Sequence, residues 1–309
     1  MRLFSRSKKE KGWLVIDESP DEVSYVHGRA EPCARAVVAA WASADAGHTG
    51  LERVARERNF ERYQCATLLR PEDYQLLLVD APPVPPAELK SALRWRIKDM
   101  LDYPVDEATL DVLDIPLPAG AAGGRAHTMF AVAARNEVIA QRIKRFEAAR
   151  IPLQVIDIRE TAQRNIAALY EVDKRGTALL FLEREAALLT INYAAELYLA
   201  RRIDIGIGQI MKYPADARHE VFERIQVELQ RTFDHFDRQH ALTVAKLVLG
   251  PEPEETGLQE FLRANLDLAV ERADLSERLE VAAAGFDAPA QWRLFHLVGA
   301  SLRQESRAA

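Results

Sequence analysis

Short apolar runs separated by polar turns open the chain and predict a strand hairpin followed by further strands and helices. The run WLVID at Trp13–Asp17 is followed by the turn Glu18–Asp21 and by a second apolar run at Val23–Val26, which is the pattern of two antiparallel strands joined by a turn. Similar patterns predict the next elements, a strand at 34–39, a helix at 51–58 and a strand at 64–69. This order of elements is typical of an α/β domain.

A smaller group of elements follows and is marked by prolines near its start. The run QLLLV at Gln75–Val79 predicts a strand, and four prolines between positions 82 and 86 end it, because proline has no N–H to donate. A helix is predicted at Ala87–Leu101, since apolar residues recur there every three or four positions. These residues are Leu89, Leu93, Ile97 and Met100.

Strands at 109–115 and 127–133 continue this group, and a helix follows them. Asn136 is predicted to cap that helix, because its short side chain can accept a hydrogen bond from an N–H of the first turn. The predicted core face of the helix carries Ile139, Ile143 and Phe146. A strand at 153–156 and a helix that runs to about Tyr170 complete the first half.

The second half repeats the opening pattern of the first. Three apolar runs predict strands at 178–182, 187–191 and 196–203, and the longest amphipathic stretch predicts a helix at 217–240. The remaining predicted elements are a strand at 245–249, a helix at 258–264, a strand at 268–270 and a final helix at 288–302. We therefore predict two α/β units in tandem.

This repetition divides the chain into predicted parts. They are a basic N-terminal arm at 1–12, a first domain at 13–172, a subdomain inserted into it at about 72–150, and a second domain at 173–309. The cations of the arm, which face a single acid, Glu10, are Arg2, Arg6, Lys8, Lys9 and Lys11. Each Lys or Arg near an anionic bilayer contributes about 1 kcal/mol of attraction, so the arm is either membrane-proximal or a solvated tail.

Composition and motifs exclude several classes of protein. The 309 residues carry 41 Lys and Arg against 47 Asp and Glu, a net charge of −6, which argues against a nucleic-acid protein that relies on a basic surface. Cys33 and Cys65 form no C-x-x-C pair. No P-loop, Rossmann, H-E-x-x-H or G-x-S-x-G motif occurs, so no catalytic residue, cofactor or metal is expected. We expect a cytoplasmic chain, because the sequence has neither a signal peptide nor 18 consecutive apolar residues.

The segment Gln75–Ile115 resembles the PilM family of pilus-assembly proteins. In that family a strand, a proline-marked turn, a helix with ELK and RW, and a YPVDEA segment follow in the same order as here. The resemblance continues at Val132–Gln163, at Arg201–Ile210 and at Leu229–Gln239, and its most specific part is Leu89–Asp106. Within the family, the length and the basic arm are most similar to the member of the mannose-sensitive haemagglutinin (MSHA) pilus system.

The resemblance implies an actin-like (ribonuclease H-like) fold, with tandem α/β domains and a small α/β insert of the 1C type in the first. It also implies a non-enzymatic cytoplasmic scaffold of a type IV pilus platform, peripheral at the inner membrane. The implied partner is a PilN-like single-pass membrane protein, called MshJ in the MSHA system. In PilM relatives, the groove beside the insert receives the cytoplasmic N-terminal peptide of that protein.

Trp95 is the residue of the predicted 87–101 helix best suited to such a partner. At 100° per residue it lies roughly opposite the apolar stripe and shares its side of the helix with Arg94 and Lys98. A Trp flanked by cations has the composition of a binding hot spot, so Arg94, Trp95 and Lys98 are the predicted partner-binding residues. The alternative is that Trp95 packs under the proline turn or against a neighbouring strand.

The resemblance to actin-like ATPases also allows a prediction about nucleotide binding. Those proteins hold phosphates in two hairpin turns, where glycine lets backbone N–H groups approach the anion. Here the corresponding turns, 17–21 and 183–185, contain acids and no glycine, and the acidic run Glu252–Glu255 is predicted to be a solvated loop. A carboxylate about 4 Å from a phosphate oxygen costs roughly 1 to 4 kcal/mol, so we predict that ATP binding is lost or nearly lost. The degenerate positions are Asp17, Glu18, Ser19, Asp21, Glu183, Glu185 and, in the adenosine-side turn, Gly250.

Two functions of different classes stay open from the sequence. The first is a non-enzymatic scaffold that positions partner proteins at a pilus platform. The second is a nucleotide-binding actin-like ATPase of pilus or type II secretion assembly, whose binding turns diverge. The missing glycines favour the scaffold. A smaller possibility is the cytoplasmic domain of a type II secretion platform protein, which would normally continue into a transmembrane helix.

Overall fold

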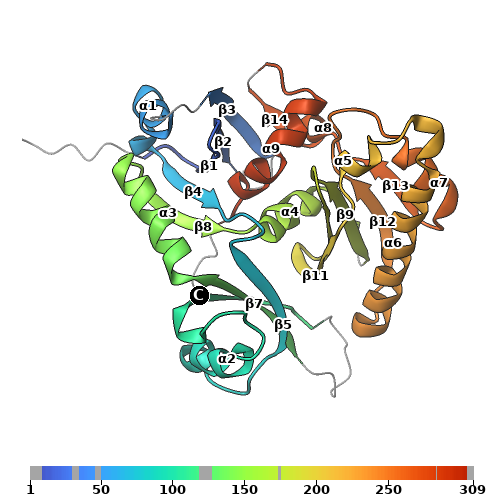
Figure 1. Cartoon of the computed structure of the whole chain (residues 1–309), viewed down its shortest axis with the longest axis horizontal. Coiled ribbons are helices and arrows are strands. Elements are labelled where there is room, and N and C mark those ends of the chain that lie inside the picture. The colour runs from blue at the N-terminus through green and yellow to red at the C-terminus, as the bar shows by residue number, and fades with distance from the viewer. Residues whose placement is uncertain are drawn as a thin grey trace, which may run out of the picture.

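The computed structural model describes residues 9–29, 35–45, 50–117, 127–172, 175–282 and 284–304. Within these residues the chain forms three β-sheets with helices around and between them (Figure 1). Two sheets are large and have matching strand orders, and the third is small and antiparallel. The prediction of tandem α/β units with a small insert is therefore confirmed, whereas the residues at which the predicted parts divide stay a prediction.

The first large sheet has the strand order β14-β3-β2-β1-β4-β8. Its first three strands form an antiparallel meander, β4 is parallel to β1, and β8 is parallel to β4. A short strand from the C-terminal part of the chain, β14, extends the sheet beside β3. The bounds are β1 (Trp13–Glu18), β2 (Glu22–Arg29), β3 (Val37–Asp45), β4 (Gln64–Leu68), β8 (Leu153–Asp157) and β14 (Glu280–Val281).

The second large sheet repeats this arrangement in the order β11-β10-β9-β12-β13. Again three strands form an antiparallel meander, and two further strands lie parallel to the first of them. Helices α6 and α7 cover one face of this sheet (Figure 1). The bounds are β9 (Gly176–Leu182), β10 (Ala187–Tyr193), β11 (Glu196–Ile203), α6 (His219–His240), β12 (Val244–Leu249), α7 (Leu258–Asn265) and β13 (Ala269–Arg272).

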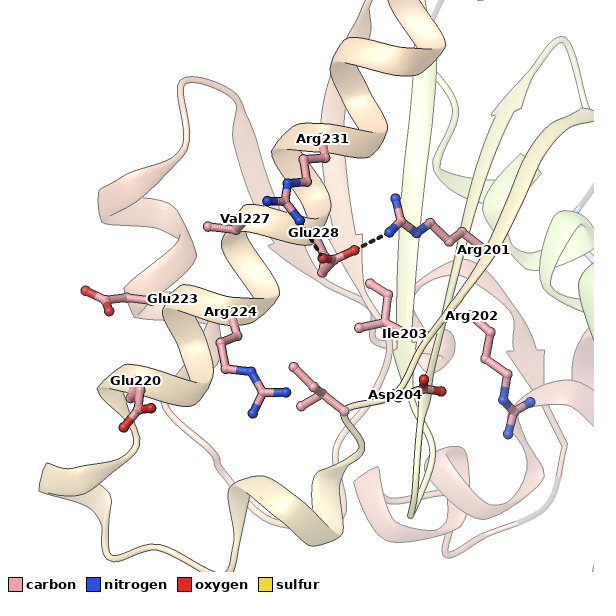
Figure 2. Close-up of a pocket in the computed structure, with 11 residues that line it drawn as sticks. Arg201, Arg202, Ile203, Asp204, Glu220, Glu223, Arg224, Val227, Glu228 and Arg231 are labelled. Atoms are coloured by element: carbon pink, nitrogen blue, oxygen red, sulfur yellow. Dashed lines mark hydrogen bonds and ion pairs between the residues drawn. The ribbon is translucent and has the colours of Figure 1, made fainter.

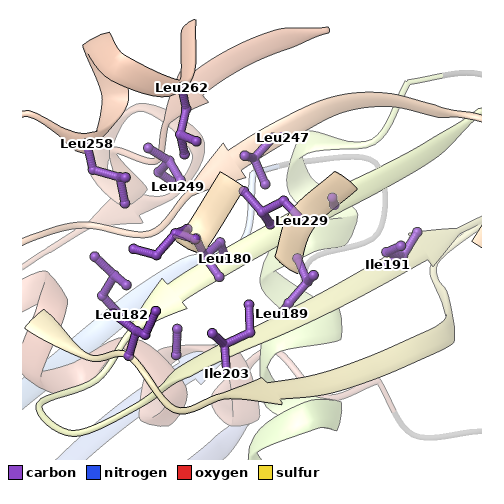
Figure 3. Packing of buried hydrophobic residues seen from close by; sticks show 14 of the residues in the cluster. Leu180, Leu182, Leu189, Ile191, Ile203, Leu229, Leu247, Leu249, Leu258 and Leu262 are labelled. Atoms are coloured by element: carbon purple, nitrogen blue, oxygen red, sulfur yellow. The ribbon is translucent and has the colours of Figure 1, made fainter. Parts of the chain in front are cut away.

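Strand β9 is buried on both faces, which explains its uninterrupted apolar run. Leu180 and Leu182 belong to the cluster on the side of α6 and α7, which also holds Leu229 of α6 and Leu247 of the neighbouring strand β12 (Figure 3). Leu179 and its neighbour Phe181 point to the other face, toward the helices between the two large sheets. The amphipathic pattern of α6 predicted its buried face correctly. The buried apolar residues of that face are Val221, Phe222, Ile225, Leu229 and Phe236.

Helices α4 (Arg159–Ala167) and α9 (Ala288–Ser301) lie between the two large sheets (Figure 1). The two helices pack closely because position 299 is a glycine. A Cβ atom at Gly299 would lie 2.1 Å from the carbonyl oxygen of Ala162. The final helix belongs to the second half of the sequence, and it also packs on β1 and β2 of the first sheet. This return of the C-terminal segment was not predicted.

The insert is a three-stranded antiparallel sheet with one helix on its face. The order is β5-β7-β6, so β5 and β6 are its edge strands. Leu93 and Ile97 of the helix are fully buried against the sheet. The bounds are β5 (Tyr74–Asp80), α2 (Leu89–Ile97), β6 (Ala108–Asp114) and β7 (Thr128–Arg135).

The remaining helices are short or lie at the rim of the first sheet. They are α1 (Gly50–Glu57), α3 (Asn136–Ala148), α5 (Ile207–Ile210), α8 (Leu275–Arg278) and the 3₁₀ turns Phe60–Arg62, Pro86–Glu88, Val105–Glu107, Ala168–Tyr170 and Ala215–Ala217. No helix in the described part of the chain combines the length and hydrophobicity needed to cross a bilayer.

Three side chains in this region were placed wrongly by the sequence. Asn136 is the first residue of α3 and not its cap, because its side chain bonds to Thr109 and to the backbone of Asp106. Ile143 is 41% exposed, since α3 packs into two separate clusters, through Ile139 and Phe146, and Ile143 belongs to neither. Met100, which was predicted to belong to the apolar stripe, is 46% exposed because α2 ends three residues before it.

Candidate functional site

The two hairpin turns predicted to face a phosphate meet at one hollow of about 590 Å³ between the large sheets. We call this hollow the cleft. It is lined by the β1–β2 turn, the segment 68–72 after β4, the β9–β10 turn, and one side of α9. Of the predicted positions, Asp17, Glu18, Ser19, Glu183 and Glu185 line the cleft, whereas Asp21 and Gly250 do not.

The first turn holds its own polar groups. Ser19 Oγ donates to the carbonyl of Glu22 at 3.2 Å and accepts from its N–H at 3.0 Å, which closes the turn. The Glu18 carboxylate accepts two hydrogen bonds from Arg145 Nε of α3, at 3.0 and 3.1 Å. Arg145 also pairs with Glu52 of α1, and this pairing lowers the pKa of the Glu52 carboxyl. The turn is therefore tied to α1 and α3.

The second turn places a carboxylate between two guanidinium groups. Arg159 Nη1 donates to Glu183 Oε1, and Arg202 Nη2 lies 3.6 Å from Glu183 Oε2. His296 Nδ1 is 3.9 Å from the same carboxylate. Burial, and secondarily the two arginines, lower the pKa of His296 well below its usual value, so its imidazole is neutral near pH 7. The charges at this point are thus one carboxylate and two guanidiniums.

Five arginines line the cleft, and sequence reasoning missed their convergence. They come from the segment after β4, the start of α4, the β9–β10 turn, β11 and α9; they are Arg70, Arg159, Arg184, Arg202 and Arg293. The cleft is therefore less acidic than its two turns suggest. Because these residues are up to 223 positions apart in sequence, no spacing motif could have revealed them.

Gly250 does not line the cleft itself and has a packing role against Phe181, a residue of the cleft wall. A Cβ atom there would lie 2.5 Å from Cδ2 of Phe181, whose ring stacks on Phe295 with centroids 4.1 Å apart. The prediction of a solvated Glu252–Glu255 loop is wrong for Glu252, which is buried, 2.9 Å from Arg272 Nη1. Burial raises the pKa of the Glu252 carboxyl. The sequence did not reveal that Arg272 of β13 lies beside Glu252 and balances its charge.

The predicted partner-binding residues lie on the outer side of α2. Trp95 is 75% exposed, so the alternative that it packs under the proline turn is wrong. Lys98 Nζ lies 5.8 Å from the centroid of the Trp95 ring. Arg94 Nη1 donates to the carbonyl of Val105 at 2.8 Å, which fastens α2 to the segment before β6. Trp95 and Lys98 thus face outward together, whereas Arg94 also has an intramolecular contact.

An apolar hollow of about 370 Å³ opens beside the insert. It lies between the edge strand β5, the edge strand β11 and α6. Its apolar lining includes Leu76, Leu78, Phe130 and Tyr198. A second hollow shares Leu78 and Gln239 with it and extends to Arg96 of α2 and to Met100, three residues after that helix. We call the two hollows together the insert groove.

A further hollow of about 580 Å³ lies between β11 and the first half of α6 (Figure 2). Some of its charged side chains pair with one another. Glu228 pairs with both Arg201 and Arg231, and the three groups are seen together in Figure 2. The remaining lining carries both signs of charge, so this hollow has no preference for an anion or a cation.

The predicted basic arm lies mostly outside the described residues, including Arg2, Arg6 and Lys8. Where the arm meets the first sheet, Glu10 pairs with Arg62 at 2.7 Å and the carbonyl of Lys11 contacts His27 Nε2 at 2.9 Å. Lys9 and Lys11 are exposed. Among the described residues, no group of three or more His, Cys, Asp or Glu side chains could hold a metal ion.

No protein-family model matches the sequence, and no curated protein matches it either. Among solved structures, the chain is similar to one from a PilM–PilN type IV pilus biogenesis complex, with 17% identity, a TM-score of 0.69, and coverage of 94% of this chain and 97% of that one. It is also similar to the cytoplasmic domain of EpsL, an inner-membrane component of the type II secretion system of Vibrio cholerae (14% identity, TM-score 0.46, coverage 92% and 95%). A Bacteroides thetaiotaomicron protein with an actin-like ATPase fold shows 10% identity, a TM-score of 0.48, and coverage of 96% and 99%. The strand order repeated in both large sheets and the likeness to the PilM–PilN complex show that this chain has the actin-like fold predicted from its sequence.

Proposed function

We propose that this protein is a non-enzymatic scaffold of a type IV pilus assembly platform, peripheral at the cytoplasmic side of the inner membrane. The observation that carries the proposal is the whole-length likeness to a structure of a PilM–PilN type IV pilus biogenesis complex. The sequence segment Leu89–Asp106, which resembles the PilM family, favours the same conclusion. Within that class, the length and the basic arm favour an MshI-type member of an MSHA pilus system.

The cleft favours a scaffold over an ATPase. Neither phosphate-side turn contains a glycine, so the close backbone approach that a polyphosphate needs is disfavoured. Glu18 is held by Arg145 and Glu183 by Arg159, so one carboxylate of each turn already has a partner within the protein. These contacts keep the turns in place with no nucleotide.

We further propose that the insert binds the cytoplasmic N-terminal peptide of a PilN-like membrane protein, of the MshJ type. Within the described part of the chain, β5 and β11 are edge strands, and the groove between them carries apolar side chains on the β5 side, which suits an extended peptide that adds a strand to β5. Leu78, at 43% exposed, is an apolar contact for such a strand. Trp95 and Lys98, on the outer side of α2, contact residues that flank it.

The exposed fraction of Trp95 makes its proposed role testable. Because three quarters of the side chain faces solvent, replacing it leaves the core intact and changes folding stability by about 0.5 kcal/mol or less. We expect Trp95→Ala to weaken peptide capture by more than about 1 kcal/mol, roughly fivefold in Kd. Leu78→Asp should weaken capture as well, because it places a carboxylate on the apolar floor.

The measurement is fluorescence anisotropy of a labelled peptide with the sequence of the partner's cytoplasmic segment. Tyr213→Ala is the matched control, since Tyr213 is also an exposed aromatic residue, at 48%, but lies between α5 and α6 and not on the insert. Equal affinities for the wild-type protein, Trp95→Ala and Leu78→Asp would show that the peptide binds elsewhere. Absence of binding to the wild-type protein would contradict the proposed partner.

A further inference from the structure

We propose that Arg159 and Arg202 form an anion site whose resident ligand is the chain's own Glu183 carboxylate. The inference rests on the proposed loss of nucleotide binding and identifies what stands in the nucleotide's place. The protein itself supplies an anion in the cleft, in place of a diffusible ligand.

The geometry of the carboxylate supports this assignment. Both oxygens of Glu183 face a guanidinium, Oε1 that of Arg159 and Oε2 that of Arg202 at 3.6 Å, and the side chain is only 13% exposed. The backbone around it is also fixed, since its N–H donates to the carbonyl of Ala186 at 2.8 Å and its carbonyl accepts from the N–H of Ile207 at 2.8 Å. The carboxylate is therefore held in one position at the wall of the cleft.

The two arginines come from the two different halves of the sequence. Arg159 is the first residue of α4, directly after the first sheet ends at β8, and Arg202 lies on β11 of the second sheet. Glu183 belongs to the turn between β9 and β10. The Glu183 carboxylate thus links α4, which lies between the two large sheets, to the β9–β10 turn and to β11 of the second sheet. A bound phosphate would make the same set of contacts, because guanidinium groups recognise carboxylate and phosphate oxygens alike.

An ordinary surface ion pair would not have the same consequence. Exposed pairs contribute about 0 to 1 kcal/mol and leave solvated charges when one member is removed. Here Glu183 is 13% exposed and Arg159 28%, whereas Arg202 is 46% exposed. Removal of Glu183 takes the shared carboxylate from both guanidiniums, which is destabilising above all for the more buried Arg159. Two other titratable groups lie nearby. They are the neutral imidazole of His296 and the buried carboxyl of Glu160, whose pKa is raised by burial. Among the described residues, Glu183 is the carboxylate within ion-pair distance of both arginines, so an external anion can take its position once it is removed.

The test compares full-length Glu183→Gln with the wild-type protein, using inorganic pyrophosphate without magnesium as the probe. We expect the variant to unfold at a lower temperature and to recover with pyrophosphate, and to bind it at least about tenfold more tightly than the wild type by titration calorimetry, since one like charge near the ligand is removed. Glu185→Gln is the matched control. It removes a carboxylate that lines the same cleft but has no ion pair among the described residues, so it should raise the affinity for pyrophosphate by much less than Glu183→Gln does.

Two further variants decide the outcome. Addition of Arg159→Gln to Glu183→Gln should abolish the gain in pyrophosphate binding. If Glu183→Gln does not fold, Glu183→Asp, which keeps the charge but shortens the side chain, should show a smaller gain. The inference is wrong if neither position-183 variant binds pyrophosphate more tightly than the wild type, or if Glu185→Gln gains equally. Peptide capture by the variants is measured in parallel, so failure of the scaffold proposal is recognised separately.

Discussion

The contact between α4 and α9 gives a prediction in which packing opposes helix propensity. Gly299 lies inside α9, where alanine is favoured over glycine by up to about 1 kcal/mol. An added Cβ would lie 2.1 Å from the carbonyl oxygen of Ala162 and 3.2 Å from Cδ1 of Ile166. The first of these atoms is backbone, so no rotamer change can relieve the clash, and the two helices must separate by about 1 Å.

We therefore expect Gly299→Ala to lower the free energy of unfolding by about 1 to 3 kcal/mol, the usual cost of overpacking a core. The assay is urea unfolding followed by circular dichroism, read as the shift of the midpoint at constant slope. Ser91→Ala on the exposed side of α2 is the control, with an expected change within about 0.5 kcal/mol. A Gly299→Ala protein as stable as the wild type, or more stable, would refute the reasoning, because propensity alone would then account for the result.

Two other predictions concern ligands of the whole chain. Titration calorimetry of the wild-type protein with magnesium-ATP should show no binding below millimolar concentration, because the turns at Glu18 and Glu183 offer carboxylates and no glycine N–H. A micromolar dissociation constant would instead support the ATPase hypothesis. Deletion of residues 2–8 should weaken binding to vesicles rich in phosphatidylserine at low salt without changing the thermal unfolding temperature, since it removes Arg2, Arg6 and Lys8 and keeps the contact of Glu10 with Arg62. Unchanged vesicle binding would leave the arm with no membrane role.

The site was predictable only where its chemistry lies on one short segment. The acids of the two turns are adjacent in sequence, and the likeness of both halves suggested that the turns correspond. The partners of those acids were not predictable, because Arg145 reaches Glu18 from 127 residues away and the Arg159 contact with Glu183 spans 24. The two turns contain a single base, Arg184, so they look acidic in isolation, and the other four arginines of the cleft enter only when distant elements meet.

The sequence by itself determined the order and nature of nearly all the elements, because strands and helices follow from local periods of about 2 and 3.6 residues that need no distant contact. The repeated strand pattern also determined the tandem architecture. Only the tertiary structure decided that α9 returns to the first sheet, that Trp95 faces solvent, and that Glu183 lies between two arginines. Each of these depends on which surfaces bury one another, and burial is a property of residues brought together from separate parts of the chain.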